Sequence, residues 1–97
     1  MASTDQGTTY RYIFNRHVNL DDAADCLTLA VCAAEGLHGR ARIRLDGSWR
    51  LDRQRRVCTI DAGTAVGRDL AKLFAGYLSA EFGDQAFWVR RTEAKAA

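Results

Sequence analysis

Two long stretches with helical hydrophobic periodicity, each flanked by short segments that alternate like strands, constrain this chain most strongly. Apolar residues recur three or four positions apart from Leu20 to Ala34, and again from Val66 to Leu78. Each helix would therefore have one apolar side that needs a covering layer. The alternating segments supply a sheet for that purpose, so the sequence predicts an α+β protein.

The ends of both helices carry capping signals. Asn19 is a typical N-cap and two aspartates follow it in the first turn, where carboxylates favour the helix dipole. We expect this helix to run to about Leu37, with glycine ending it at Gly39. Thr64 is the expected N-cap of the second helix, which should end at Gly83.

The strand predictions leave two questions open. Tyr10 to Val18 and Ala86 to Arg91 have strand-like alternation, but the face of the first strand that is buried, tyrosine or arginine, is undecided. Arg40 to Leu45 also alternates strictly and is followed by Asp46-Gly47, a pair typical of a hairpin turn. With a further strand at Val57 to Asp61, residues 40–61 would hold either two or three strands.

The predicted order is β-α-β-β-α-β, with one additional meander strand as an alternative. This pattern resembles the ferredoxin-like arrangement, a two-layer sandwich with two helices on one face of a mostly antiparallel sheet. We expect a single domain over residues 10–91, a disordered polar tail over residues 1–9 and a short polar tail over residues 92–97. The resemblance implies no function, because this fold hosts many.

Composition limits the class of protein. A chain of 97 residues can build one core, and 47% hydrophobic with 27% charged residues is a globular balance. No apolar run is long enough to span a membrane, and the polar start lacks the features of a secretory signal. Three cysteines, an odd number, do not form a disulfide framework. We therefore expect a cytoplasmic protein with no membrane association.

The first helix suggests a protein partner. From Cys26 to Ala34 every residue except Thr28 is apolar, so Cys26, Leu29 and Ala33 would lie on a second face that the sheet does not cover. Such a face predicts a protein–protein interaction or regulatory module that docks on a partner or forms a homo-oligomer. The alternative is that these small residues are simply exposed, which needs no explanation.

A second hypothesis is nucleic-acid binding on the sheet. Seven arginines and only two aspartates fall between positions 40 and 56. If Ala41, Ile43 and Leu45 face the helices, the opposite face gathers arginines and an aromatic side chain, which is what single-stranded nucleic acid uses. That face would comprise Arg42, Arg44, Arg50, Trp88 and Arg90. The RNA-recognition motif family shares the element order, but residues 56–61 lack its glycine and aromatic signature, and an acidic protein would fit the same residues.

Nothing in the sequence points to catalysis. Cys26, Cys32 and Cys58 have neither zinc-ligand spacing nor a nucleophile signature around them, and the segment around Thr64 is not a phosphate-binding loop. We expect no catalytic residue, no metal and no cofactor. A small enzyme without a visible motif is the third hypothesis, and it would need a deep pocket that contains His17 or a cysteine.

Overall fold

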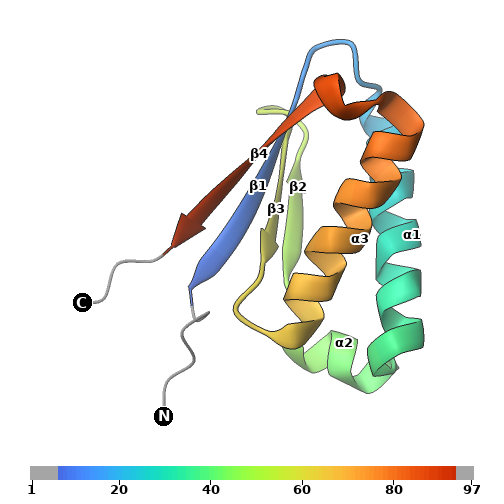
Figure 1. Cartoon of the computed structure of the whole chain (residues 1–97), viewed down its shortest axis with the longest axis vertical. Coiled ribbons are helices and arrows are strands. Elements are labelled where there is room, and N and C mark those ends of the chain that lie inside the picture. Colours follow the sequence, from blue (N-terminus) through green and yellow to red (C-terminus); the bar gives the residue numbers. More distant parts are fainter. Residues whose placement is uncertain (1–6, 94–97) are drawn as a thin grey trace.

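Four strands form one antiparallel sheet, and two long helices cover one of its faces (Figure 1). The structure is a computed structural model that describes residues 7–93. The elements in chain order are β1 (Thr8–Phe14), α1 (Leu20–His38), α2 (Arg40–Asp46), β2 (Trp49–Asp52), β3 (Val57–Asp61), α3 (Ala65–Phe82), the 3-10 turn η1 (Asp84–Ala86) and β4 (Phe87–Glu93). The strand order is β2-β3-β1-β4. The predicted β-α-β-β-α-β order and two-layer sandwich are confirmed.

The register of the central strand decides which side chains are core. Tyr12 of β1 lies opposite Cys58 of β3 and Val89 of β4, and Tyr12 and Phe14 are buried against the helices. The Tyr12 hydroxyl donates a hydrogen bond to the Ala71 carbonyl of α3 at 2.7 Å. Burial of a side chain of this size contributes about 2 kcal/mol. The tyrosine face of β1 is therefore the core face.

Both predicted N-caps are present. The Asn19 side chain accepts a hydrogen bond from the Asp21 backbone N–H at 2.8 Å, and the Thr64 hydroxyl accepts one from Gly67 at 3.0 Å. Gly67 also allows α3 to approach β3, because a Cβ there would lie 1.9 Å from the Asp61 carbonyl oxygen. Gly39 follows α1 with a φ of 86°, a conformation that favours glycine. The caps thus set the start of each long helix on the sheet.

The segment predicted as a strand from Arg40 to Leu45 is a helix, so that prediction is wrong. Ile43 is buried, whereas Leu45 is 79% exposed, because positions two apart cannot share one face of a helix. Alanine, arginine and leucine favour helix, and Arg42 pairs with Asp46 one turn later at 2.9 Å. Gly47 donates its N–H to the Ile43 carbonyl at 2.9 Å and ends the helix.

Residues 40–61 therefore contain two strands, β2 and β3, and their hairpin turn lies at residues 53–56 rather than at Asp46-Gly47. Arg56 closes this turn with a positive φ of 57°. Its guanidinium donates hydrogen bonds to the carbonyl oxygens of Asn15, at 2.9 Å, and Val18. This arginine connects the β2–β3 turn to the loop between β1 and α1.

The strands reach beyond the predicted limits of the folded region. β1 begins at Thr8 and β4 ends at Glu93, so both include residues expected in the polar tails, and β1 ends at Phe14 rather than Val18. The remainder of those tails, residues 1–6 and 94–97, lies outside the described residues. Among the helices of residues 7–93, none is both long and apolar enough to cross a membrane.

Candidate functional site

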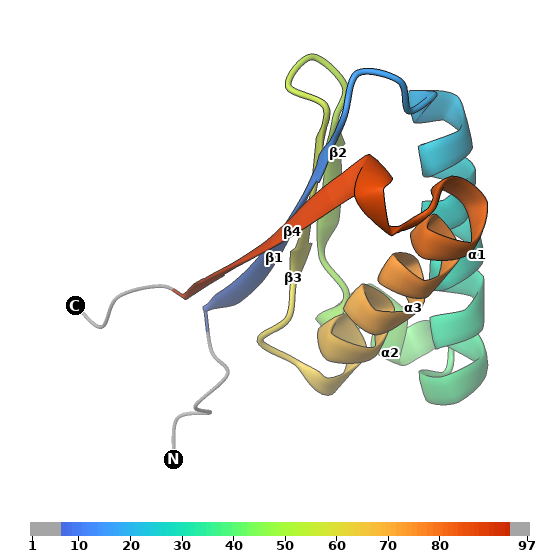
Figure 2. The same cartoon turned by 45° about the horizontal axis from the view of Figure 1, so that its top comes forward.

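The side of the sheet that faces away from the helices is covered by no helix or strand of residues 7–93 (Figures 1 and 2). Strand alternation assigns side chains to this open face, as the pairing registers define it. The open face consists of Thr9, Arg11, Ile13, Arg50, Asp52, Val57, Thr59, Asp61, Trp88, Arg90 and Thr92. It combines basic, hydroxyl and apolar side chains on one surface.

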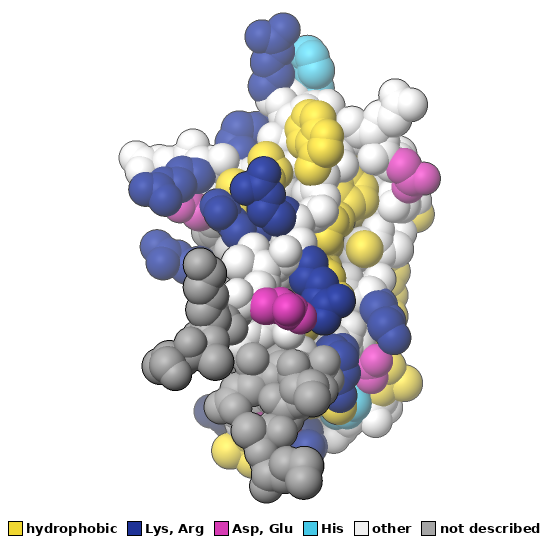
Figure 3. Space-filling model, turned by 60° about the vertical axis from the view of Figure 1, so that its left-hand side comes forward, with side chains coloured by type: hydrophobic (Ala, Val, Ile, Leu, Met, Phe, Trp, Pro, Cys, Tyr) yellow, Lys and Arg dark blue, Asp and Glu magenta, His cyan; other side chains and the backbone are white. Residues whose placement is uncertain are grey.

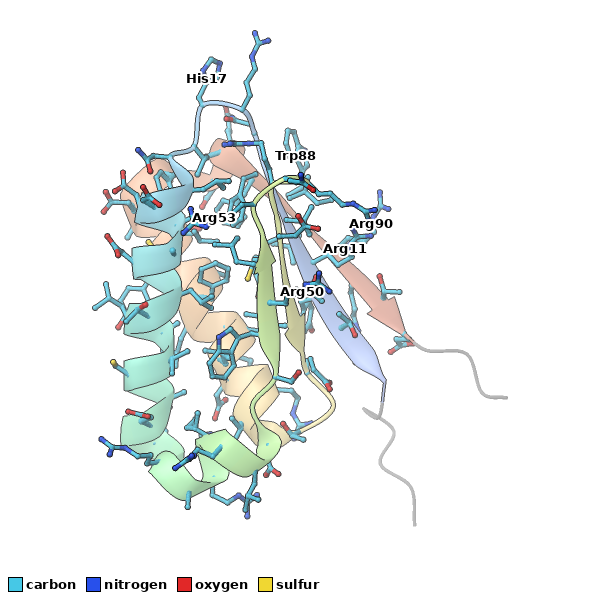
Figure 4. The ribbon with its side chains drawn as sticks, turned by 180° about the vertical axis from the view of Figure 1, so that it is seen from behind. Arg11, His17, Arg50, Arg53, Trp88 and Arg90 are labelled. Carbon is cyan, nitrogen blue, oxygen red and sulfur yellow. The ribbon has the colours of Figure 1, made fainter. Side chains whose placement is uncertain are left out.

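Three arginines lie in one line across the open face, and we call them the arginine row. Arg50 of β2 pairs in register with Thr59, Thr59 with Arg11 of β1, and Arg11 with Arg90 of β4. Since neighbouring strands are about 4.8 Å apart, the row spans about 14 Å. In Figure 4 the side chains of Arg11, Arg50 and Arg90 project from the sheet on the side away from the helices.

Within residues 7–93 no carboxylate forms an ion pair with a member of the arginine row. The two aspartates of the open face have other partners. Asp52 lies 3.9 Å from the Arg55 guanidinium and accepts the Arg55 backbone N–H at 3.1 Å. Asp61 accepts the backbone N–H of Gly63 at 2.8 Å. No described carboxylate therefore neutralises a guanidinium group of the row by direct pairing.

An apolar row runs beside the arginines. Trp88 of β4 lies opposite Ile13 of β1, which lies opposite Val57 of β3. Val57 is buried, Ile13 is half-buried and Trp88 is 59% exposed. The indole of Trp88 therefore presents much of its surface to solvent at the edge of an apolar strip, two residues from Arg90 on the same strand.

The open face is hollowed near its β2 edge. Val57 and Thr59 lie in the hollow together with the aliphatic and charged parts of longer side chains. The lining residues are Arg11, Arg50, Asp52, Arg55, Val57 and Thr59. The space-filling view shows more basic than acidic side chains on this side of the molecule (Figure 3). A ligand in this hollow would meet three guanidinium groups and one carboxylate.

The structure brings together part of the predicted basic face. Arg50, Trp88 and Arg90 lie on the open face, whereas Arg42 and Arg44 lie on α2 and were wrongly placed on the sheet. Arg11 was not among the predicted residues. In the sequence Arg11 alternates with Tyr10 and Tyr12. Once the tyrosine side of β1 is known to be the core face, Arg11 must lie on the open face.

The predicted interface on α1 is altered by the packing of its side chains. Cys26 is only 5% exposed, and its thiol donates to the Tyr77 carbonyl of α3 at 3.9 Å, so its predicted outward position is wrong. Burial, with the negative charges of nearby acidic residues, raises the pKa of this thiol. Leu29 is 53% exposed and Ala33 is half-buried. Leu29 is thus the large apolar side chain on the outer side of the predicted patch.

The residues considered for catalysis do not meet. His17 lines a surface hollow with Asn15, Val18 and Phe82 that contains no cysteine, while Cys32 lines a separate groove beside Trp49. Cys58 is fully buried in β3, which raises the pKa of its thiol to about 12. Among the described residues, no three histidine, cysteine, aspartate or glutamate side chains are grouped so that they could hold a metal ion.

Comparison with known proteins adds no family or relative. Searches with protein-family profiles, against curated proteins and against solved structures found no match to this chain. The functional argument therefore depends on the geometry and charge of the molecule itself, and above all on the open face of the sheet.

Proposed function

We propose that the open face binds single-stranded nucleic acid, with the arginine row on the phosphates and Trp88 stacked on a base. One observation carries this proposal: three arginines that pair with no described carboxylate lie in register beside an exposed tryptophan, on the face that no described element covers. The ligand class was the alternative that the sequence suggested. The proposed nucleic-acid contacts now include Arg11, which lies on the open face, and exclude Arg42 and Arg44, which lie on α2.

The arrangement of the arginines favours a polyanion. Like charges that lie directly opposite in a sheet destabilise it, and Arg11 and Arg90 are such a pair. An anion between them would remove this repulsion and accept hydrogen bonds from both guanidinium groups, which match phosphate oxygens well. Because the row crosses the strands, it suits an extended chain of anionic groups better than one isolated ion.

Trp88 favours single-stranded nucleic acid over an acidic peptide. Trp88 and Arg90 are two positions apart on β4, so their side chains leave the sheet about 7 Å from each other on the same face. A nucleotide presents a phosphate and a flat base within that distance, and stacking of a base on an aromatic ring contributes about 1–3 kcal/mol. Bases are free to stack in this way only when they are not paired in a duplex.

Docking or self-association through the outer side of α1 stays a prediction. Its exposed centre is Leu29, with Ala33 partly accessible beside it. The exposed Asp22 and Asp25 lie on the same side of α1 as Leu29, so the charge of this surface is acidic. The arginine row instead aligns three like charges that select negative charge. We therefore place nucleic-acid binding first and treat the α1 surface as the second candidate.

The test is a fluorescence anisotropy titration with labelled single-stranded oligothymidylate and oligouridylate of about a dozen nucleotides. We expect Arg11→Ala and Arg90→Ala each to weaken binding and to reduce the slope of log K against log salt by about 0.7, the value for one phosphate contact on a single strand. Arg44→Ala, which removes the same charge from α2, is the matched control and should bind like the unmodified protein.

Two results would contradict the proposal. One is binding that is absent, or that does not change between about 50 mM and 200 mM salt, since phosphate contacts must release counterions. The other is an equal loss of affinity in the Arg44→Ala control, which would mean that only net charge matters. Tighter binding to polyglutamate than to either oligonucleotide would instead assign the face to an acidic protein.

A further inference from the structure

A cleft opens on the helix side of the sheet, between α3 and the edge formed by β1 and β4. The ends of β1 and β4 that are remote from η1 diverge from α3 in both cartoon views (Figures 1 and 2). Val89 shows the consequence: its side chain is on the core face of β4, yet it is 47% exposed. The cleft is lined by Tyr10, Tyr12, Arg68, Ala71, Lys72 and Val89. It lies on the opposite side of the sheet from the arginine row.

Rings and methyl groups make up most of the cleft wall. The Tyr12 hydroxyl is already engaged, because it donates to the Ala71 carbonyl at 2.7 Å. Tyr12 and Ala71 are only 1% and 4% exposed and form the floor of the cleft, while the accessible Val89 adds methyl groups at its edge. The cleft is thus suited to an apolar group.

The charged groups of the lining are both cationic. Arg68 and Lys72 lie one turn apart on α3, and none of the described lining residues is a carboxylate. Lys72 is exposed and forms no ion pair with a described carboxylate. Asp69, the carboxylate of the same helical turn, is engaged with the His38 ring at 2.8 Å. A ligand with an anionic end would therefore find a complementary charge at Lys72.

The size of the cleft limits the ligand. Its volume is about 200 Å³, and a cavity of about 150 Å³ is enough to hold benzene. We propose that this cleft binds a small amphipathic carboxylate, with one aromatic ring or a short aliphatic chain between Tyr10, Ala71 and Val89, and the carboxylate beside Lys72. The site is independent of the proposed nucleic-acid face, since Val89 and Arg90 leave β4 on opposite sides.

The probe is benzoate, with neutral benzyl alcohol as its uncharged counterpart, and binding is followed by NMR shifts of labelled protein. We expect benzoate to shift the resonances of Tyr10, Ala71 and Val89 in a saturable manner. Lys72→Gln should weaken benzoate about five-fold, the ratio for one favourable ion pair near a surface, and leave benzyl alcohol unchanged. Arg44→Gln removes a charge elsewhere and should alter neither. Val89→Phe, which fills the cleft from an accessible position, should abolish both.

The proposal is overturned if benzoate leaves these three resonances in place, or if Lys72→Gln affects benzoate no more than Arg44→Gln does. It is also overturned if the unmodified protein is a dimer that Val89→Phe dissociates, because the cleft would then be a contact between two copies. Lys72→Gln and Val89→Phe should keep the oligonucleotide affinity of the unmodified protein. Failure of this site would therefore leave the nucleic-acid proposal standing, and the reverse also holds.

Discussion

Arg11 of β1 and Arg90 of β4 occupy directly opposite positions of the antiparallel ladder, with both side chains on the open face of the sheet. Two guanidinium groups in such a position repel each other, at a cost of about 0.2–1 kcal/mol. No described carboxylate pairs with either group to offset this cost. The free protein therefore carries an electrostatic destabilisation that an anionic ligand would relieve.

This relationship predicts a conflict between stability and binding. Arg90→Glu should replace the repulsion by a cross-strand ion pair with Arg11 and raise the free energy of unfolding by about 0.5–1 kcal/mol. In a protein of this size the melting temperature should rise by about 2–8 °C at low salt, while oligonucleotide affinity is lost. Arg44→Glu on α2 makes the same charge change and should do neither. A fall in melting temperature for Arg90→Glu, or the same rise in both variants, would contradict this explanation.

A second prediction concerns Arg56, which holds the β2–β3 turn against the loop between β1 and α1. Its guanidinium donates to the carbonyls of Asn15 and Val18, and its φ of 57° is costly for any residue with a Cβ. Arg56→Ala should therefore lose about 2 kcal/mol of unfolding free energy, and Arg56→Gly about 1 kcal/mol, because glycine accepts this φ. Urea unfolding measures both. Equal losses would show that the backbone conformation adds nothing.

The buried thiol and phenol predict a loss of stability at alkaline pH. Burial raises the pKa of Cys58 from 9.0 to about 12. Burial, with smaller contributions from the charges of Cys58 and Tyr10, also raises the pKa of Tyr12 well above its usual value of 10.0. Both groups are neutral in the folded protein below these values, whereas the unfolded chain loses its protons earlier. Each group therefore contributes stability that is complete below its unfolded pKa and is lost as pH rises toward its folded pKa.

The expected size of this effect is about 1.4 kcal/mol of unfolding free energy per pH unit and per group, beginning near pH 9 for the thiol and near pH 10 for the phenol. Urea unfolding from about pH 8 to pH 11 should show it. Cys58→Ala should be less stable at pH 8, because it leaves a small cavity, but its stability should fall less steeply with pH. An identical slope in both proteins would contradict the assignment to Cys58.

The α1 surface has its own test. Leu29→Glu should abolish any association through this surface and change the unfolding free energy by no more than about 0.5 kcal/mol, because the side chain is largely exposed. Leu45→Glu on α2 is the matched control, since Leu45 is even more exposed. Light scattering over a range of concentrations gives the oligomeric state. A dimer that survives Leu29→Glu would exclude this surface as the contact.

The sequence predicts those parts of the fold that depend on local interactions. Asn19 and Thr64 could be identified as caps because their side chains bond to N–H groups only two or three residues away. The two helical stripes were visible for a related reason, since one face of each long helix is buried against the same sheet. Local chemistry and tertiary packing agree in these elements, and the β-α-β-β-α-β order follows from them.

The strand prediction for Arg40 to Leu45 is wrong because local and tertiary requirements differ there. The alternation of arginine with apolar residues has a period of two, which is typical of a strand, although arginine, alanine and leucine also form helices well. A helix is distinguished from a strand here only by the burial of Ile43 in the hydrophobic core while Ala41 and Leu45 stay exposed. Cys26 raises the same difficulty, because the contact that buries it is with Tyr77, 51 residues away.

The arginine row could be predicted only in part for the same reason. Arg50, Trp88 and Arg90 follow from alternation within their own strands. Arg11 required a choice between the tyrosine and arginine faces of β1, and that choice depends on what the helices cover. The register that aligns Arg50, Thr59, Arg11 and Arg90 comes from pairing between strands that are distant in sequence.

The most direct test of the open face uses Trp88 itself as the reporter. The chain has two tryptophans, so Trp49→Phe leaves Trp88 as the single indole. We predict that single-stranded oligothymidylate quenches its emission saturably, with a midpoint that Arg11→Ala shifts to higher concentration, and that polyglutamate of equal charge quenches it far less. Trp88 emission that stays constant while anisotropy shows the oligonucleotide to be bound would contradict the proposal, and so would equal quenching by polyglutamate.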